Sequence, residues 1–244
     1  MELTHGSLFS GIGGFDLGFE RAGFTTVWQV ENGLYCQAIL AQHFPDAQRF
    51  GDIRTICWDK IKQPTVLSGG SPCQDISVAG KAAGLQGARS GLWSYFYRAI
   101  SILRPSYVVV ENVSALLFRG LGRVLGDLSE IGYDAEWEVI SAHTVGAPHL
   151  RERVFLIAYP NRLNGQTRLG IITDGAIARL KACMAERHEL WLQTRPDPNR
   201  MGDGLPARLY RPRVQALGNA VVPQIAEEIA WMIRRVIEGG AVHE

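Results

Sequence analysis

Short apolar segments alternate along the chain with amphipathic ones, and glycine or proline marks most of the boundaries. A continuous β-branched run at residues 106–110 is typical of a strand that is buried on both faces of a parallel sheet. The pattern therefore predicts an α/β fold with a mostly parallel sheet. It predicts strands over residues 3–9, 25–30, 65–69, 106–110, 133–142 and 153–159, a strand end at 50–53, and helices over 15–22, 33–44, 94–103, 116–131 and from 223 onward.

The regular rhythm is lost between residues 161 and 211, where arginine, proline and glycine are frequent and a helix is predicted only at 175–192. We therefore predict a main domain at 1–160, a short recognition region at 161–210 and a C-terminal segment at 211–244. The helix of this last segment should pack back onto the main domain, because Ile225, Ile229, Ile233 and Val236 recur at helical spacing.

Positive charge is concentrated in one part of the chain, although the net charge is only +1. Residues 149–213 hold 12 Lys/Arg against 6 Asp/Glu, and the remainder holds 13 against 18. Arginine forks suit phosphates and base edges, so this basic segment indicates a nucleic-acid partner. An ordinary solvated arginine-rich surface is the alternative.

Composition restricts the class of protein further. A chain of 244 residues that is 46% hydrophobic can bury a full-sized core. No apolar run is long enough to cross a bilayer, and Glu2 and His5 interrupt any signal-peptide segment. The four cysteines are scattered without a CxxC pair, which argues against zinc and disulfides and fits a reducing cytoplasm.

The stretch at residues 69–74, Gly-Gly-Ser-Pro-Cys-Gln, places Cys73 on a tight corner directly after a predicted strand. A thiol held exposed in this way is a candidate nucleophile, whereas a small buried hydrophobe is the structural alternative. The following residues, 75–89, are rich in glycine and alanine, and we interpret them as a mobile lid over the site. A connector with no role is the other interpretation.

A glycine-rich turn at residues 10–14 lies between the first predicted strand and helix, as in α/β units that bind nucleotides or cofactors. Glu31 ends the second strand, where a carboxylate can accept the hydroxyl groups of a ribose. Asp52 follows the third strand and could hydrogen-bond an exocyclic amine or cap the next helix. Further along, Glu111 ends a central strand, and Arg151 shares one face of an extended segment with His149 and Arg153.

In this order the motifs resemble those of the DNA (cytosine-5) methyltransferases, which use S-adenosylmethionine. The matching blocks span nearly the whole chain outside residues 161–210. They are Leu8–Gly14, Val30–Asn32, Gly51–Ile53, Gly70–Gln74, Glu111–Val113, Arg151–Phe155 and Leu217–Pro223. The resemblance implies a Rossmann-like methyltransferase fold with a small recognition lobe.

The resemblance also implies roles for individual residues. Cys73 would attack C6 of a cytosine extruded from the DNA duplex, Glu111 would protonate or hydrogen-bond N3, and Arg153, with Arg151 behind it, would contact the base carbonyl. Double-stranded DNA would be the substrate, and a cognate restriction endonuclease a possible functional partner. The cofactor site would comprise Phe9, Gly11, Gly13, Glu31, Asp52, Ile53, Pro72, Leu92 and Asn219.

Two departures from the family pattern and three alternatives accompany this interpretation. His149 stands where the family commonly has glutamine, and the recognition region is short. A short region also suits an RNA cytosine methyltransferase of the same fold. A catalytically silent nucleic-acid-binding protein would not need Cys73, Glu111 and Arg153 together. A thiol hydrolase that uses Cys73 with His149 would leave the glycine turn and Glu31 without a purpose.

Overall fold

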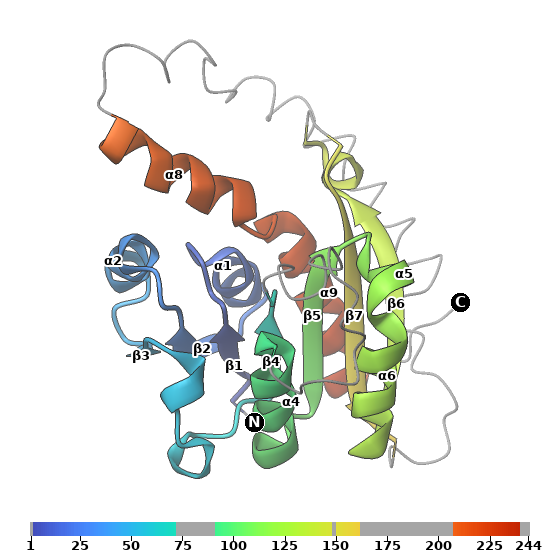
Figure 1. Cartoon of the computed structure of the whole chain (residues 1–244). Coiled ribbons are helices and arrows are strands. Elements are labelled where there is room, and N and C mark those ends of the chain that lie inside the picture. Colours follow the sequence, from blue (N-terminus) through green and yellow to red (C-terminus); the bar gives the residue numbers. More distant parts are fainter. Residues whose placement is uncertain (1, 72–90, 148–149, 162–206, 240–244) are drawn as a thin grey trace.

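A computed structural model describes residues 2–71, 91–147, 150–161 and 207–239 (Figure 1). No helix within these ranges is long and apolar enough to cross a membrane. In chain order the elements are β1 (Thr4–Leu8), α1 (Gly14–Arg21), β2 (Thr25–Val30), α2 (Leu34–His43), β3 (Gln48–Phe50), η1 (Ile53–Thr55), η2 (Trp58–Lys60), β4 (Val66–Gly69), α4 (Leu92–Leu103), β5 (Tyr107–Val113), α5 (Leu116–Arg119), α6 (Leu121–Glu130), β6 (Tyr133–Ser141), η3 (Ala142–Val145), β7 (Glu152–Pro160), α8 (Ala207–Asn219) and α9 (Pro223–Ile237).

The described strands form one seven-stranded sheet in the order β3-β2-β1-β4-β5-β7-β6. Strands β3, β2, β1, β4 and β5 run parallel, whereas β7 is antiparallel to both β5 and β6. The chain moves outward from β1 in one direction through β2 and β3, and in the other through β4 and β5. Ligands of open α/β sheets bind at such a switch point, beside the carboxyl ends of the strands. Here the ends of β1 and β4 are neighbours, with Leu8 in register with Gly69.

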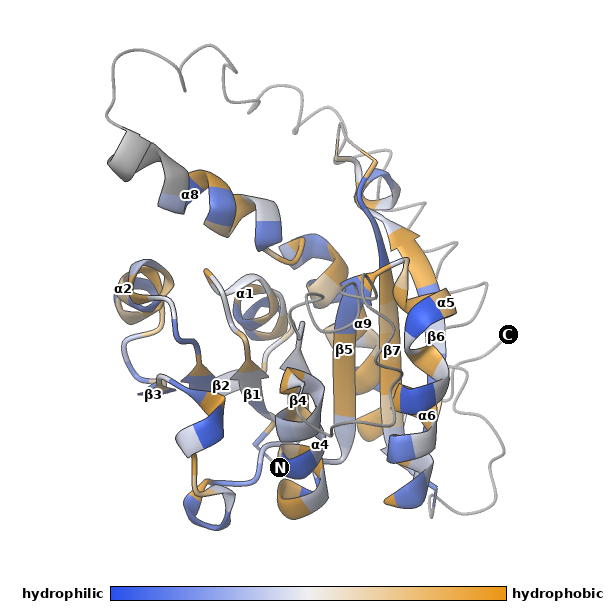
Figure 2. Ribbon diagram, in the orientation of Figure 1, coloured by the Kyte–Doolittle hydropathy of each residue, from blue (hydrophilic) through white to orange (hydrophobic). Residues whose placement is uncertain are grey.

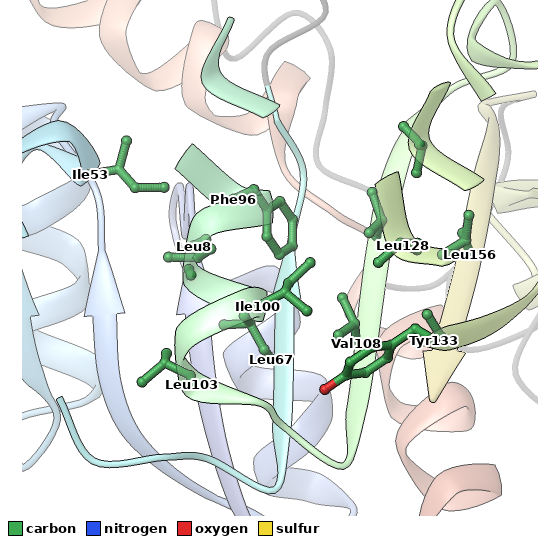
Figure 3. Close-up of a cluster of buried hydrophobic side chains, with 14 of the residues drawn as sticks. Leu8, Ile53, Leu67, Phe96, Ile100, Leu103, Val108, Leu128, Tyr133 and Leu156 are labelled. Carbon is green, nitrogen blue, oxygen red and sulfur yellow. The ribbon is translucent and has the colours of Figure 1, made fainter. Parts of the chain in front are cut away.

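Helices cover both faces of the sheet, so the central strands are buried, and β5 and β7 are largely apolar (Figures 1 and 2). Helices α1 and α9 cover one face and bury Phe19 and Ile229 against it. Helices α4 and α6 cover the other face, where Phe96 and Leu128 are fully buried (Figure 3). Both cores pack against the sheet below the carboxyl ends of the parallel strands and so hold these strand ends in place.

The predicted strands and most predicted helices are confirmed, with two informative differences. The helix predicted over 116–131 is two helices, because Gly120 has a non-helical backbone (φ −171°, ψ −12°) between them. Strand β5 continues past residue 110 to Val113, because Glu111 and Asn112 still pair with β7. Glu111 is therefore held inside a strand and does not follow it.

The C-terminal segment packs as the sequence predicts. Ile225, Ile229 and Ile233 of α9 are buried in the core that α9 shares with α1. Helix α8 is continuous from residue 207 to residue 219, so the boundary expected at 210 falls inside a helix. The helix predicted at 175–192 lies outside the described residues.

Candidate active site

The glycine turn between β1 and α1 has the geometry that its sequence indicates. Gly11 (φ +57°) and Gly13 (φ +87°) adopt left-handed conformations, and so does Phe9 (φ +53°). A Cβ on Gly13 would lie 2.6 Å from the ring of Phe44, so a side chain is excluded there by space as well as by conformation. Among the described residues, the nearest atom to a Cβ on Gly11 would be the Phe9 carbonyl oxygen at 4.0 Å, so within this part of the chain there is space beside the turn for a ligand.

Glu31 points its carboxylate at this turn. Oε2 accepts a hydrogen bond from the Gly11 amide at 2.9 Å, and Oε1 accepts one from the Gly33 amide at 2.7 Å. A carboxylate has about four acceptor positions, so two remain after these bonds. The structure thus brings Gly11 and Glu31 together, with acceptor capacity suited to a pair of ligand hydroxyls.

Asp52 has the capping role that the sequence left as one of two options. Its carboxylate accepts hydrogen bonds from the backbone amide and the guanidinium of Arg54, at the start of η1. These bonds lower the pKa of Asp52 to about 2. Ile53 is buried in the core beside Trp58, so it has little surface to offer a ligand. Contact of Asp52 or Ile53 with an adenine ring stays a prediction.

Phe9 and Leu92 lie on the edge of the core on the α4 side of the sheet. Both are half-buried and pack against it, and the Phe9 ring lies 6.3 Å from that of Phe96 between centroids. Leu92 is the first residue of α4, which begins directly after residues 72–90. The structure therefore places both at the rim of the switch point.

Glu111 and Arg153 form an ion pair at the end of β5. The Arg153 Nε lies 3.1 Å from Glu111 Oε1, and the two residues come from adjacent antiparallel strands. Burial raises the pKa of Glu111, and the neighbouring Arg153 and Arg151 partly oppose that increase. Oε2 of Glu111 lies against Gly70, where an added Cβ would be only 2.9 Å away. A buried acid with a raised pKa beside an arginine is suited to proton donation and to the binding of a polar ring edge.

Asn112 connects this strand to the segment that carries the candidate nucleophile. Its Nδ2 donates to the Ser71 carbonyl oxygen at 3.2 Å. Cys73 and Pro72 themselves lie outside the described residues, as do His149 and the predicted lid at 75–89. Ser71, two positions before Cys73, is thus fixed beside the Glu111 strand.

Arg151 is separated from Arg153 in a way that the sequence did not predict. Its guanidinium donates hydrogen bonds to the carbonyl oxygens of Gly218 and Ala220, on either side of Asn219. Burial, with the charge of Arg153 adding to it, lowers the pKa of Arg151. The two arginines therefore have different partners, although the resemblance implies that they act together. Arg153 contacts Glu111, and Arg151 fixes the junction between α8 and α9.

A cleft beside Arg151 and Arg153 opens toward Leu17 and Arg21 of α1. It runs from Arg151 and Arg153 past Ser114 to the α8–α9 junction. Among the described residues, no group of three or more His, Cys, Asp or Glu side chains could hold a metal ion. The remaining residues of the cleft wall are Leu17, Arg21, Leu150, Glu152, Leu217, Gly218 and 220–224.

A buried polar cluster under the glycine turn was missed by the sequence reasoning. Asp16 of α1 accepts hydrogen bonds from Ser7 of β1 and Gln29 of β2, and all three side chains are fully buried. Two features of the sequence could have revealed this cluster, and the first is a carboxylate beside the apolar positions 15 and 19 of an amphipathic helix. Polar residues inside two strands were the second signal.

Comparison with known proteins gives consistent matches. A family model described as C-5 cytosine-specific DNA methylase matches residues 3–188. The type II methyltransferase M1.HphI of Haemophilus parahaemolyticus is 36% identical over 171 residues, which cover 64% of this chain and 46% of that protein. The type II methyltransferase M.AquIA of Picosynechococcus sp. is 34% identical over 184 residues, covering 67% of this chain and 73% of that protein.

One solved structure matches almost end to end. The Entamoeba histolytica methyltransferase EhMeth has a TM-score of 0.67 over 97% of this chain and 99% of its own, at 15% identity. At that identity the likeness shows the fold alone. The chain spans about half the length of the first curated relatives that it matches.

Proposed function

Because the chain belongs to the C-5 cytosine-specific DNA methylase family, we propose that it transfers a methyl group from S-adenosylmethionine to C5 of cytosine in double-stranded DNA. The observation that carries the proposal is the ion pair between the buried Glu111 of β5 and the partly buried Arg153 of β7. This pair lies beside Gly70 and Ser71 and on the same edge of the sheet as the glycine turn. Glu111, Arg153 and the glycine turn proposed to bind the cofactor thus lie at the same edge of the sheet. A methyltransferase that acts on a base requires these groups near one another.

The residues at the switch point fit the proposed cofactor. The open side of Gly11 and the remaining acceptor positions of Glu31 suit a ribose, and Phe9 and Leu92 supply apolar surface at the rim. Pro72 and Asn219 complete the proposed walls, with contributions from Gly13, Asp52 and Ile53. When bound, S-adenosylmethionine supplies an electrophilic methyl group on a sulfonium. Arg151 contributes by fixing the backbone on both sides of Asn219.

The chain's own residues activate the cytosine in this proposal. C5 is a poor nucleophile, so the Cys73 thiolate adds to C6 and turns C5 into an enamine-like carbon. Glu111, whose pKa is raised by burial, gives a proton or a hydrogen bond to N3 so that negative charge does not build up on the ring. Arg153 holds Glu111 and contacts the base carbonyl. After C5 is methylated, a base removes the C5 proton and the C6–S bond breaks, which restores the thiolate.

The proposal implies a particular access to the substrate. C5 and C6 lie inside the duplex stack, so the nucleotide must leave the helix and enter the cleft. The loop at 75–89 would close over it, and residues 161–210 would contribute to the choice of target sequence. We expect such a protein to act in the cytoplasm on cellular DNA. The type II relatives make a cognate restriction endonuclease the protein partner to seek.

A methyl-transfer assay tests the proposal directly. Purified full-length chain is incubated with tritiated S-adenosylmethionine and either DNA from a host that lacks cytosine methylation or total RNA. We expect label in DNA, and bisulfite sequencing of that DNA should locate a single cytosine within a defined sequence. Label in RNA alone would instead support the RNA methyltransferase.

Substitution of the proposed nucleophile gives the sharper result. Cys73→Ser should abolish transfer, because an alcohol does not supply an anion of comparable nucleophilicity at neutral pH. Cys57→Ser is the matched control, because Cys57 is exposed and lies away from the switch point. Duplex DNA with 5-fluorocytosine should trap a covalent complex with the wild-type chain, since fluorine does not leave as a proton does. Full activity of Cys73→Ser would refute the mechanism.

A further inference from the structure

Asp16, in the first turn of α1, is a completely buried carboxylate that connects the elements around the glycine turn. Its Oδ2 accepts a hydrogen bond from Ser7 Oγ at 3.2 Å, and its Oδ1 accepts one from Gln29 Nε2 at 2.9 Å. Ser7 is the penultimate residue of β1 and Gln29 that of β2. One side chain therefore ties α1 to the ends of the two strands that carry the turn and Glu31.

The turn itself is bonded to the same neighbourhood. The Ser10 hydroxyl donates to the Ser7 carbonyl oxygen at 3.2 Å, and the Ser10 amide donates to the Val30 carbonyl oxygen at 3.1 Å. Gly13, which ends the turn, is the N-cap of α1. A change in how Asp16 holds Ser7 and Gln29 would thus be transmitted to the backbone next to Gly11.

The charge of Asp16 is not balanced by a cation. Among the described residues it forms no ion pair, its two side-chain partners are neutral, and the charged group that acts on it is Glu20, which has the same sign. Burial raises its pKa to about 6, so it is ionised at neutral pH. An uncompensated buried carboxylate is costly, and an asparagine of the same shape would avoid that cost. Packing alone therefore gives no reason for an acid at this position.

We propose that Asp16 is a positioning residue that holds the glycine turn between β1 and β2 and makes the adjacent cofactor site prefer a positively charged ligand. The inference rests on the proposed function. S-adenosylmethionine carries a sulfonium charge that its product, S-adenosylhomocysteine, lacks. A fixed negative charge beneath the turn favours the methyl donor over the product, and so favours both loading of the enzyme and product release.

Titration calorimetry with both ligands tests the preference without any DNA. The full chain is compared with Asp16→Asn, which keeps the shape but removes the charge. Glu20→Gln is the matched control, because Glu20 is an exposed acid one turn further along the same helix. We expect Asp16→Asn to weaken binding of S-adenosylmethionine by about five- to tenfold. Binding of S-adenosylhomocysteine should change by less than about twofold, and Glu20→Gln should preserve the ratio of the two affinities.

The outcomes separate this inference from the proposed function. If Asp16→Asn weakened the binding of both ligands equally, or otherwise left the ratio of their affinities unchanged, the charge preference would be overturned. The proposal of a methyltransferase that binds this cofactor would still stand. A matching change in Glu20→Gln would also overturn it. If the wild-type chain bound neither ligand, the proposed function itself would fail.

A second measurement changes the pH and leaves Asp16 in place, so it does not depend on the folding of an Asp16 variant. Lowering the pH from about 7.5 to about 5 protonates Asp16, and the preference for S-adenosylmethionine should decrease. On β1, His5 has a pKa lowered to about 3 by burial and stays neutral throughout. The other elements around Asp16 carry few groups that could titrate in its place. β2 has no titratable side chain, and Glu227 and Arg234 face α1 from α9. The acid on α1 itself is controlled for by Glu20→Gln. A ratio that does not vary with pH would overturn the proposal.

Discussion

Replacement of Asp16 by asparagine should make the protein more stable at neutral pH, even though it removes a hydrogen-bonded side chain. Asp16 is completely buried, and its desolvation outweighs its hydrogen bonds to Ser7 and Gln29. Both neighbours can adapt to an amide. The Ser7 hydroxyl can rotate, and Gln29 can flip its side chain so that Oε1, which has no hydrogen-bond partner among the described residues, accepts from the new Nδ2.

The magnitude follows from the pKa of Asp16. An increase from its ordinary value of 3.8 to about 6 corresponds to about 3 kcal/mol, at about 1.4 kcal/mol per pKa unit. Because the folded pKa is the higher one, the stability contributed by Asp16 is fully present below about pH 3.8 and is lost as the pH rises through about 6. At about pH 7.5 the wild-type chain therefore bears the full cost of burying the ionised carboxylate, and Asp16→Asn bears none of it. For a chain of 244 residues, this difference corresponds to a Tm that is about 6 °C higher in the variant.

Urea unfolding of wild type and Asp16→Asn at about pH 7.5 and about pH 5 measures this effect. The difference in unfolding free energy should be about 3 kcal/mol at the higher pH and should decrease at the lower. Glu111, whose pKa is also raised, titrates in both proteins and cancels in the difference, whereas Glu20 interacts with Asp16, so the comparison is repeated with Glu20→Gln in both proteins. A variant that is less stable than wild type at the higher pH, or a difference that does not change with pH, would refute the reasoning. A more stable variant that binds S-adenosylmethionine less well would separate a functional charge from a structural one.

Three further outcomes are expected. Glu111→Gln should reduce methyl transfer by about 100-fold or more while the protein still binds S-adenosylhomocysteine, because the amide cannot supply the proton; an unimpaired rate would exclude the acid role. Gly18→Ala should lower the free energy of unfolding by about 1–3 kcal/mol in urea unfolding, because its Cβ would lie 2.6 Å from that of Ala226, whereas no loss would mean that α1 and α9 separate easily. Gly13→Ala should weaken cofactor binding in calorimetry, because a left-handed alanine costs about 1–2 kcal/mol and its Cβ would displace Phe44; unchanged affinity would show that this turn does not shape the site.

The local pattern was sufficient to predict the strands of the sheet and its mostly parallel character. The runs at residues 65–69 and 106–110 are short and largely apolar and lie between turn-forming residues, and such runs have few alternatives to a buried strand. The contact between Glu31 and Gly11 was also predictable, because both follow adjacent parallel strands, and the carboxyl ends of such strands meet at one edge.

Other features depend on partners that are distant in the sequence. Strand β5 extends to Val113 because β7 supplies pairing partners about 40 residues later in the chain. In the same way, Arg151 and Arg153 alternate on one extended segment, but only the folded chain brings the carbonyl groups of Gly218 and Ala220 to the first and the carboxylate of Glu111 to the second.

The sequence by itself determined the α/β class, the glycine turn with its carboxylate, and the ordered set of residues that carries the family chemistry. These are local signals, since each depends on a few neighbouring residues and on the period of the pattern. Only the tertiary structure showed that Asp52 caps a helix, that Arg151 holds the C-terminal junction, and that Asp16 is buried with no cationic partner in the described part of the chain. Burial and charge compensation are properties of the assembled surroundings, to which α1, β1 and β2 all contribute.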